Sequence, residues 1–205
     1  MIKLKISFSK EKEIERVIYT MDKIDWFNEN GYRPILPLEI NKDFFLSKGK
    51  EGVTDAVEKE FSVDDYEKTK TYIENNQSDI LPKLYEFVKK IGFTPQEEYI
   101  IVLTKYGVAG SYHVPNTIVI NIKMKYEKGL MRTIVHEILH LTIENLIKEY
   151  KISHWKKERV IDLLLNECVP DYVRFQNIPE DTQKLDGIFR REFPNVQLIL
   201  TKIGQ

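Results

Sequence analysis

The chain has 205 residues, and its 31 Lys and Arg against 32 Asp and Glu give a formal net charge of −1. A chain so close to neutral has no overall positive electrostatic field that would attract nucleic acid or an anionic membrane. Eleven Tyr, ten Phe and two Trp exclude a disordered chain, and one cysteine excludes an internal disulfide. No run approaches the roughly 18 apolar residues of a membrane span. We therefore expect a soluble cytoplasmic protein that binds neither nucleic acid nor a membrane, in an oligomeric state left open.

The first 95 residues are predicted to form a mainly helical N-terminal region. A short alternating segment, 2–8, precedes apolar residues at helical spacing over 12–28. Two prolines make 32–40 an extended connection, and a second helical block is predicted over 62–91, with a serine cap at its start and a glycine after its end. This region carries no recognisable motif, so no function is assigned to it.

From residue 96 the pattern changes to short β-branched segments and long apolar helices. Segments 99–104 and 117–122 predict two strands, and 130–150 predicts a helix that is buried around most of its circumference. Ser153 can cap another helix, and a further helix is expected over 181–193. The sequence therefore predicts an α+β fold in which 1–95 and a metal-binding region, 96–205, form one compact unit.

The predicted buried helix contains His136, Glu137 and His140 in the pattern H-E-x-x-H. Residues four apart lie on one face of a helix, about 6 Å apart along its axis, so the two imidazoles can hold one metal ion. Glu137 projects about 100° away, where it can reach a metal-activated water without binding the metal. A pair of hydrogen-bonded core histidines is the alternative reading. Because burying these groups without partners would be costly, the pattern favours a Zn²⁺ site with Glu137 as the general base.

A zinc site of this kind needs a third protein ligand and leaves the fourth position for water. The metzincin continuation is absent, because Ile143 and Leu146 occupy the positions of its glycine and histidine. Peptide deformylases carry a ligand cysteine upstream of the helix, whereas Cys168 lies downstream. Neither of these two zinc families fits the sequence.

Two acidic pairs follow the motif, each with four-residue spacing: Glu158 with Asp162, and Glu167 with Asp171. Asp162 lies in an otherwise apolar run, where a charge without a partner would be expensive. The second pair surrounds a proline that would disturb its helix. His154 is a further candidate, either as a ligand or as a donor to an oxyanion. Residue-level reasoning leaves these alternatives open.

The arrangement of Glu158 and Asp162 after the motif resembles the gluzincins, the thermolysin-like zinc metallopeptidases. The resemblance covers 117 to about 171, and Lys157 replaces the asparagine that usually precedes the ligand glutamate. It implies that His136, His140 and Glu158 bind the zinc ion. It also implies that Glu137 is the general base and that Asp162 orients His136.

The resemblance also implies a zincin-like core made of a small sheet, the active-site helix and the glutamate helix. In zincins an edge strand pairs antiparallel with the bound peptide, and 117–122 occupies the matching place in the chain order. An ordinary core strand is an equally good reading of 117–122. His154, Tyr112, His113 and Tyr172 are candidates for stabilising an oxyanion, and Glu144 is expected to have a supporting or surface role.

The sequence thus predicts an enzyme that hydrolyses a peptide bond in a peptide or protein substrate, using zinc, an activated water and Glu137. The alternative is a zincin-like zinc protein that binds a peptide or protein partner without cleaving it. This second reading requires a pocket that the N-terminal region blocks.

Overall fold

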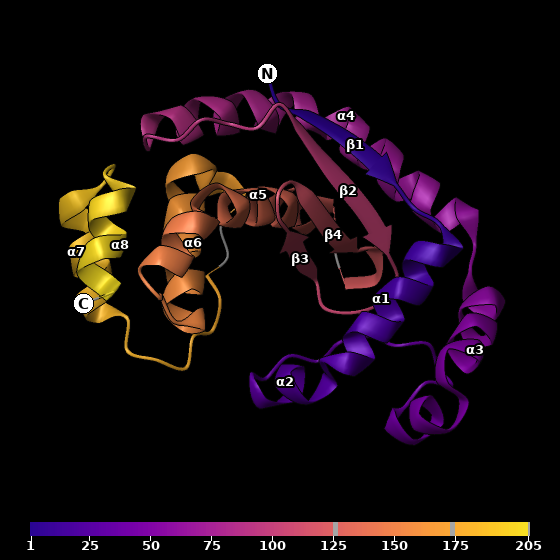
Figure 1. Cartoon of the computed structure of the whole chain (residues 1–205). Coiled ribbons are helices and arrows are strands. Elements are labelled where there is room, and N and C mark those ends of the chain that lie inside the picture. Colours follow the sequence, from indigo (N-terminus) through magenta and orange to yellow (C-terminus); the bar gives the residue numbers. More distant parts are fainter. Residues whose placement is uncertain (125–126, 173–174, 205) are drawn as a thin grey trace.

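The computed structural model describes residues 1–124, 127–172 and 175–204. Four strands form one mixed sheet, and eight α-helices lie within the described residues (Figure 1). The predicted α+β class is therefore confirmed, with helices making up most of the chain.

The sheet has the strand order β1-β2-β4-β3. Strand β1 (Lys3–Ser7) pairs parallel with β2 (Glu98–Thr104), and β2 pairs parallel with β4 (Thr117–Asn121). Strand β3 (Gly110–His113) pairs antiparallel with β4 and lies at the edge. The described residues thus place three parallel strands beside one antiparallel edge strand.

Of the two readings of 117–122, the ordinary core strand is confirmed and the edge strand is wrong, because β4 lies inside the sheet between β2 and β3. The physical reason is composition. Ile118 and Ile120 are fully buried and Val119 is 7% exposed, so both faces of β4 are covered. Strand β3, Gly-Ser-Tyr-His, is partly exposed and polar, as suits the edge of a sheet.

The N-terminal region is mainly helical, as predicted, but its segmentation differs. The predicted helix over 12–28 is broken at Lys23, and the predicted block over 62–91 is one helix that continues through Pro82. The sequence analysis missed a helix that is kinked at Gly49, where φ is +56°. The four helices are α1 (Lys10–Asp22), α2 (Ile24–Glu29), α3 (Lys42–Glu60) and α4 (Val63–Lys90).

The three helices predicted after residue 96 are confirmed, whereas the last helix, α8, was not predicted. The predicted helix over 130–150 is α5 (Glu127–Glu149), which packs against β3, β4, α4 and α6. Ser153 is the N-cap residue of α6 (His154–Cys168), although its side chain makes no capping hydrogen bond. The predicted helix over 181–193 is α7 (Gln183–Glu192), and α8 (Val196–Gly204) follows it. Two short 3₁₀ turns are η1 (Ile122–Met124) and η2 (Pro170–Tyr172).

One hydrophobic core joins the two halves of the chain. Apolar residues of β2 and β4, such as Ile101 and Ile118, pack with Leu84 of α4 and with Ile134 and Ile138 of α5. A smaller apolar cluster lies between α1 and α3. The N-terminal region therefore supplies a strand and a long helix to the core that surrounds α5.

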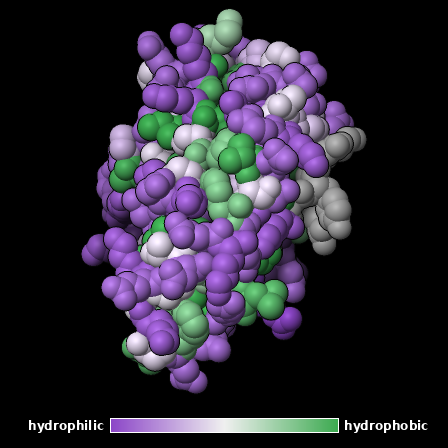
Figure 2. Space-filling view, turned by 90° about the vertical axis from the view of Figure 1, so that its right-hand side faces the viewer, coloured by the Kyte–Doolittle hydropathy of each residue, from purple (hydrophilic) through white to green (hydrophobic). Residues whose placement is uncertain are grey.

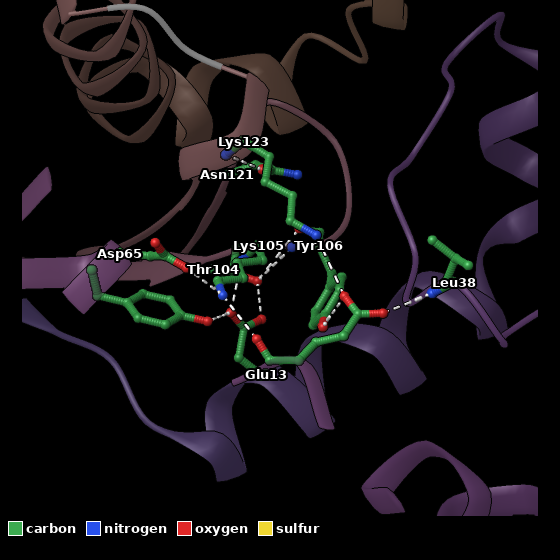
Figure 3. A network of polar contacts seen from close by, with 10 residues as sticks. Glu13, Leu38, Asp65, Thr104, Lys105, Tyr106, Asn121 and Lys123 are labelled. Atoms are coloured by element: carbon green, nitrogen blue, oxygen red, sulfur yellow. Dashed lines mark hydrogen bonds and ion pairs between the residues drawn. The ribbon is translucent and has the colours of Figure 1, made fainter. Parts of the chain in front are cut away.

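A buried polar network fixes α1 to the end of β2 (Figure 3). Glu13 of α1 is fully buried and accepts hydrogen bonds from the Tyr66 hydroxyl, the Thr104 hydroxyl and the Lys105 backbone N–H. The Lys105 ammonium pairs with Asp65 at 2.7 Å. Burial raises the pKa of Glu13, although the three donors act against that shift. Since α1 also reaches β3, this network holds the edge strand indirectly.

The face of the molecule in Figure 2 is largely hydrophilic, with hydrophobic side chains in small patches between polar ones. None of the described helices combines the length and apolar character needed to cross a membrane.

The Glu13 network predicts a specific stability change. Glu13→Ala leaves three buried donors without their acceptor and should lower the free energy of unfolding by about 2–3 kcal/mol. The measurement is urea unfolding followed by circular dichroism. Glu15→Ala, at an exposed position of the same helix, is the matched control and should change stability by less than about 0.5 kcal/mol.

Glu13 should also show a pH signature. Because its folded-state pKa is raised above 4.5, its contribution to stability is present at low pH and declines as the pH rises through the folded-state value. The stability advantage of the wild type over Glu13→Gln should therefore shrink from pH 4 to pH 8. An advantage that grew with pH would mean that the buried group is held as a carboxylate.

Candidate metal centre

Three buried side chains from two neighbouring helices converge on one point. His136 and His140 lie on one face of α5, and their Nε2 atoms are 3.0 Å apart. Glu158 of α6 places its Oε2 atom 3.3 Å from the first Nε2 and 3.4 Å from the second. The ligand atoms of all three residues lie within 4.8 Å of one another. This group is therefore close enough to hold one metal ion.

The other acidic pair does not reach this point. Glu167 is nine positions beyond Glu158, which turns its side chain by about 180° around α6, and it is exposed. Asp171 is likewise exposed, in the short turn η2. His154 lies closer to the cluster than Glu167 and Asp171 do, with its Nδ1 atom 3.9 Å from Glu158 Oε1. The structure thus brings Glu158, and not Glu167, to the two histidines.

Charge and burial make this cluster suited to a cation. Burial would raise the pKa of Glu158, but the two histidines lower it well below its usual value, so the carboxylate is ionised. Burial lowers the pKa of His140 to about 4 and keeps this imidazole neutral. For His136, burial acts to lower the pKa, but Glu158 and the nearby carboxylates Glu137 and Asp162 raise it. Two imidazoles beside an ionised carboxylate form a donor set that suits zinc, and a bound zinc ion would displace the proton that these carboxylates favour on His136.

Asp162 lies one turn beyond Glu158 on α6, and its carboxylate lies on the Nδ1 side of the His136 ring, away from the cluster. Its side chain is 1% exposed, and its Oδ1 atom lies 4.0 Å from His136 Nδ1. Both of these atoms are buried without a hydrogen-bond partner among the described residues. Burial raises the pKa of Asp162. This placement is the one that the resemblance implies for a residue that orients His136.

Gln176, which the sequence analysis missed, connects the two carboxylates. Its backbone N–H donates to Asp162 Oδ2 at 2.7 Å, and its side-chain amide donates to Glu158 Oε2 at 2.9 Å. It belongs to the irregular segment 175–182, and no spacing rule links such a residue to helix residues that precede it by 14 to 18 positions. Gln176 thus restrains the orientation of both acidic side chains.

Glu137 is 6% exposed and lies against the backbone of the edge strand. A Cβ atom added to Gly110 would lie 2.4 Å from Glu137 Oε1 and 2.5 Å from Thr133 Cγ2. A side chain at position 110 would therefore force Glu137 Oε1 and Thr133 Cγ2 to shift. Glycine at position 110 therefore lets the carboxylate of Glu137 sit beside the edge strand.

A cavity of about 440 Å³ opens over the cluster. Its floor contains His136, Glu137, His140 and Glu158, and β3 forms part of its wall. The N-terminal region supplies another part of the wall, with three aromatic rings from 26–32 and one from α1: Trp26, Phe27, Tyr32 and Tyr19. The region without a motif is therefore part of the site.

The structure separates the candidates for stabilising an oxyanion. His154 and Tyr112 line the cavity, whereas His113 packs against Tyr19 and Tyr172 lines a separate pocket beside α4. A hydrogen bond of 2.8 Å links His154 Nε2 to the hydroxyl of Tyr32, which sequence reasoning did not find. Burial raises the pKa of Tyr32 and lowers that of His154, so the tyrosine hydroxyl is the donor.

Tyr112 supports the second histidine. Its ring stacks on His140 with a centroid distance of 4.9 Å and an interplanar angle of 14°. Its hydroxyl donates to Glu144 Oε2 at 2.6 Å and accepts from Lys157 Nζ at 3.1 Å. Glu144 therefore has a supporting role, because it holds the ring that packs on His140.

Comparisons with protein-family models, with curated proteins and with solved structures gave no match to this chain. The resemblance to gluzincins consequently stands on the residues and spacings of the site alone.

The cluster predicts a graded response to substitution. His136→Ala or Glu158→Ala should weaken zinc binding by orders of magnitude, because a site with three protein ligands loses one of them. Asp162→Ala should weaken it by about 10- to 100-fold, as expected for a residue that orients a ligand. Affinity is measured by competition with a chromogenic chelator.

Glu167→Ala is the matched control in the same helix and should leave zinc affinity unchanged. Loss of zinc in this control, with affinity retained in Glu158→Ala, would move the third ligand to the end of α6.

Proposed function

We propose that this protein is a zinc-dependent peptidase with a gluzincin-like active site. The observation that carries the proposal is the meeting of Glu158 with both histidines of the H-E-x-x-H motif, in a cavity that Glu137 of the same motif also lines. Two imidazoles and a carboxylate, with a position left for water, form the donor set of hydrolytic zinc sites. Zinc bound there would lower the pKa of a coordinated water and polarise the scissile carbonyl.

In this proposal Glu137 is the general base. Its carboxylate lines the same cavity as the three groups that converge, where it would accept the proton of the attacking water and return it to the leaving amine. Tyr32 lies in the same cavity, and to stabilise the developing oxyanion its hydroxyl would turn its one proton from His154 Nε2 to the substrate.

Strand β3 offers the substrate a backbone partner. The Asn121 N–H donates to the Ala109 carbonyl, and the alternation of an antiparallel ladder then directs the N–H and C=O groups of Gly110 and Tyr112 away from β4. These groups lie at the open edge of the sheet, beside Glu137. An extended peptide pairing with them would pass over the cluster, which is the role expected earlier of 117–122.

The alternative, a zinc protein that binds a partner without cleaving it, requires the N-terminal region to block the site. That region lines the cavity, but the cavity that also contains the cluster keeps a volume of about 440 Å³. This space supports the enzymatic reading, and the next experiment separates the two functions.

Substitution of the base should separate catalysis from metal binding. Glu137→Gln should retain one zinc per chain and a native circular dichroism spectrum, while its peptide hydrolysis falls by about 100-fold or more because proton transfer is lost. The assay is digestion of a peptide library followed by mass spectrometry. Turnover at the wild-type rate in this variant would rule out the proposed mechanism, even with zinc bound.

Hydrolysis should depend on metal and on pH. A chelator should abolish the activity and added zinc should restore it, whereas acidification should slow it because protons compete for the base and for the imidazoles. Hydrolysis that resists chelation would point to another active centre or to a contaminant.

Gly110→Ala tests the position of the base. The added methyl group cannot fit beside Glu137 and should displace its carboxylate, lowering kcat by about 10- to 100-fold while zinc content is retained. Gly187→Ala is the control, since a Cβ atom there meets nothing within 4 Å. Equal activity of the two variants would contradict the assigned place of Glu137.

A further inference from the structure

Among the described residues, three arginine and lysine side chains line the cavity, and neither the zinc ligands nor the general base account for them. They are Arg33 in the segment after α2, Arg132 near the start of α5 and Lys157 of α6. A bound zinc ion would offset the two carboxylates of the floor, Glu137 and Glu158, and would leave a surplus of positive charge. A cavity with such a surplus suits a substrate that carries a negative charge.

The three cations differ in what already holds them. Lys157 Nζ donates to a tyrosine hydroxyl of β3 at 3.1 Å and lies 3.8 Å from Glu158 Oε1. Burial raises the pKa of Asp162, and the charge of Arg132 is among those that act against this rise. Arg33 is exposed, and its side chain makes no hydrogen bond or ion pair with another described residue. The two arginines are the better carboxylate ligands, because a guanidinium offers two parallel N–H donors.

The direction of a peptide on β3 follows from the contacts of that strand with α5. Gly110, at the start of the strand, lies beside Thr133, whereas the Tyr112 ring stacks on His140. The strand therefore runs along α5 from its earlier turns to its later ones. Antiparallel pairing is the more stable per residue, so a peptide on the open edge would run the opposite way. Its carboxyl end would then point toward the first turns of α5.

Arg132 lies on that side of the cluster. It precedes His136 by four residues, so it occupies the same face of α5 about 6 Å earlier along the helix axis. An extended peptide advances about 3.3 Å per residue. With the cleaved bond at the cluster, one or two further residues would therefore bring the peptide to Arg132.

We infer that Arg132 and Arg33 bind the free C-terminal carboxylate of the substrate, which makes the protein a carboxypeptidase that removes one or two residues from a peptide. This inference rests on the proposed function and adds a substrate class to it. A substrate that ends in an amide cannot make the charge-assisted hydrogen bonds of a carboxylate, and its kcat/KM should be about 10- to 100-fold lower.

The first test compares two peptides that are identical except that one ends in a free carboxylate and the other in an amide. The wild type should favour the free acid by about 10- to 100-fold in kcat/KM and release one or two residues from its carboxyl end. Arg132→Met should remove most of that preference. Arg132→Lys should keep part of it, because the charge remains without the two parallel donors.

Two further variants and two outcomes complete this test. Arg33→Gln should lower the preference by only about 3-fold, because this side chain is exposed. Arg190→Met, at an exposed arginine of α7 outside the cavity, is the control and should retain the preference. An equal loss on both peptides in Arg132→Met would overturn the carboxylate site, because it would leave this arginine only a supporting role beside Asp162. Cleavage of internal bonds at equal rates in the acid and the amide would also overturn it.

The second test does not depend on turnover. Isothermal titration calorimetry compares N-acetyl-alanylalanine with its C-terminal amide on the zinc-loaded Glu137→Gln chain, so that the probe is not consumed. The acid should bind about 10- to 100-fold more tightly, and adding Arg132→Met should remove this difference. A difference that survives Arg132→Met would place the carboxylate on the zinc ion and overturn the site.

The two tests together separate this inference from the proposed function. A binding difference that Arg132→Met removes, without any peptide cleavage by the wild type, would keep the carboxylate site and refute the peptidase. Cleavage by the wild type with no difference between acid and amide, in rate or in binding, would refute the carboxylate site and keep the peptidase.

Discussion

The structure depends on one electrostatic constraint, the burial of three electron-pair donors at a single point. Two imidazole nitrogens 3.0 Å apart and a carboxylate oxygen within 3.4 Å of both repel one another unless a cation or a shared proton lies among them. The packing of α5 against α6 imposes this arrangement. A metal ion would turn that repulsion into attraction, which is why the cluster is read as a metal centre and not as part of the core.

The N-terminal region contributes to this centre through its contacts with the sheet. Arg16 of α1 is 5% exposed and donates to the hydroxyl of Ser111 on β3 at 3.1 Å. It passes so close to Gly107, whose φ is +81°, that a Cβ atom there would lie 2.3 Å from Arg16 Nε. With Glu13 of the same helix anchored at the end of β2, α1 holds the edge strand from one side while α5 supports it from the other. The region thus positions the strand and supplies aromatic rings that line the cavity.

The parts of the site that lie on one helix could be predicted from the sequence. Spacing of four placed the two histidines together, and an aspartate inside an apolar run marked the buried face of α6 on which Glu158 also lies. Glu167 could have been set aside by the same helical geometry, because nine residues place it on the opposite face.

The parts that depend on tertiary contacts could not be predicted. Gln176 and Tyr32 reach the site from irregular segments, where no periodicity relates sequence position to direction. Strand β3 has no run of β-branched residues, so its place at the sheet edge follows only from the insertion of β4 beside β2. Helix α3 was missed because a glycine with positive φ interrupts it.

X-ray absorption at the zinc edge of the purified full-length chain tests the central claim most directly. The account predicts one tightly bound zinc, with nitrogen and oxygen donors at about 2.0–2.1 Å and the outer-shell scattering of two imidazoles. Sulfur in the first shell, which would place zinc at Cys168, or a chain that binds no zinc at all would contradict it.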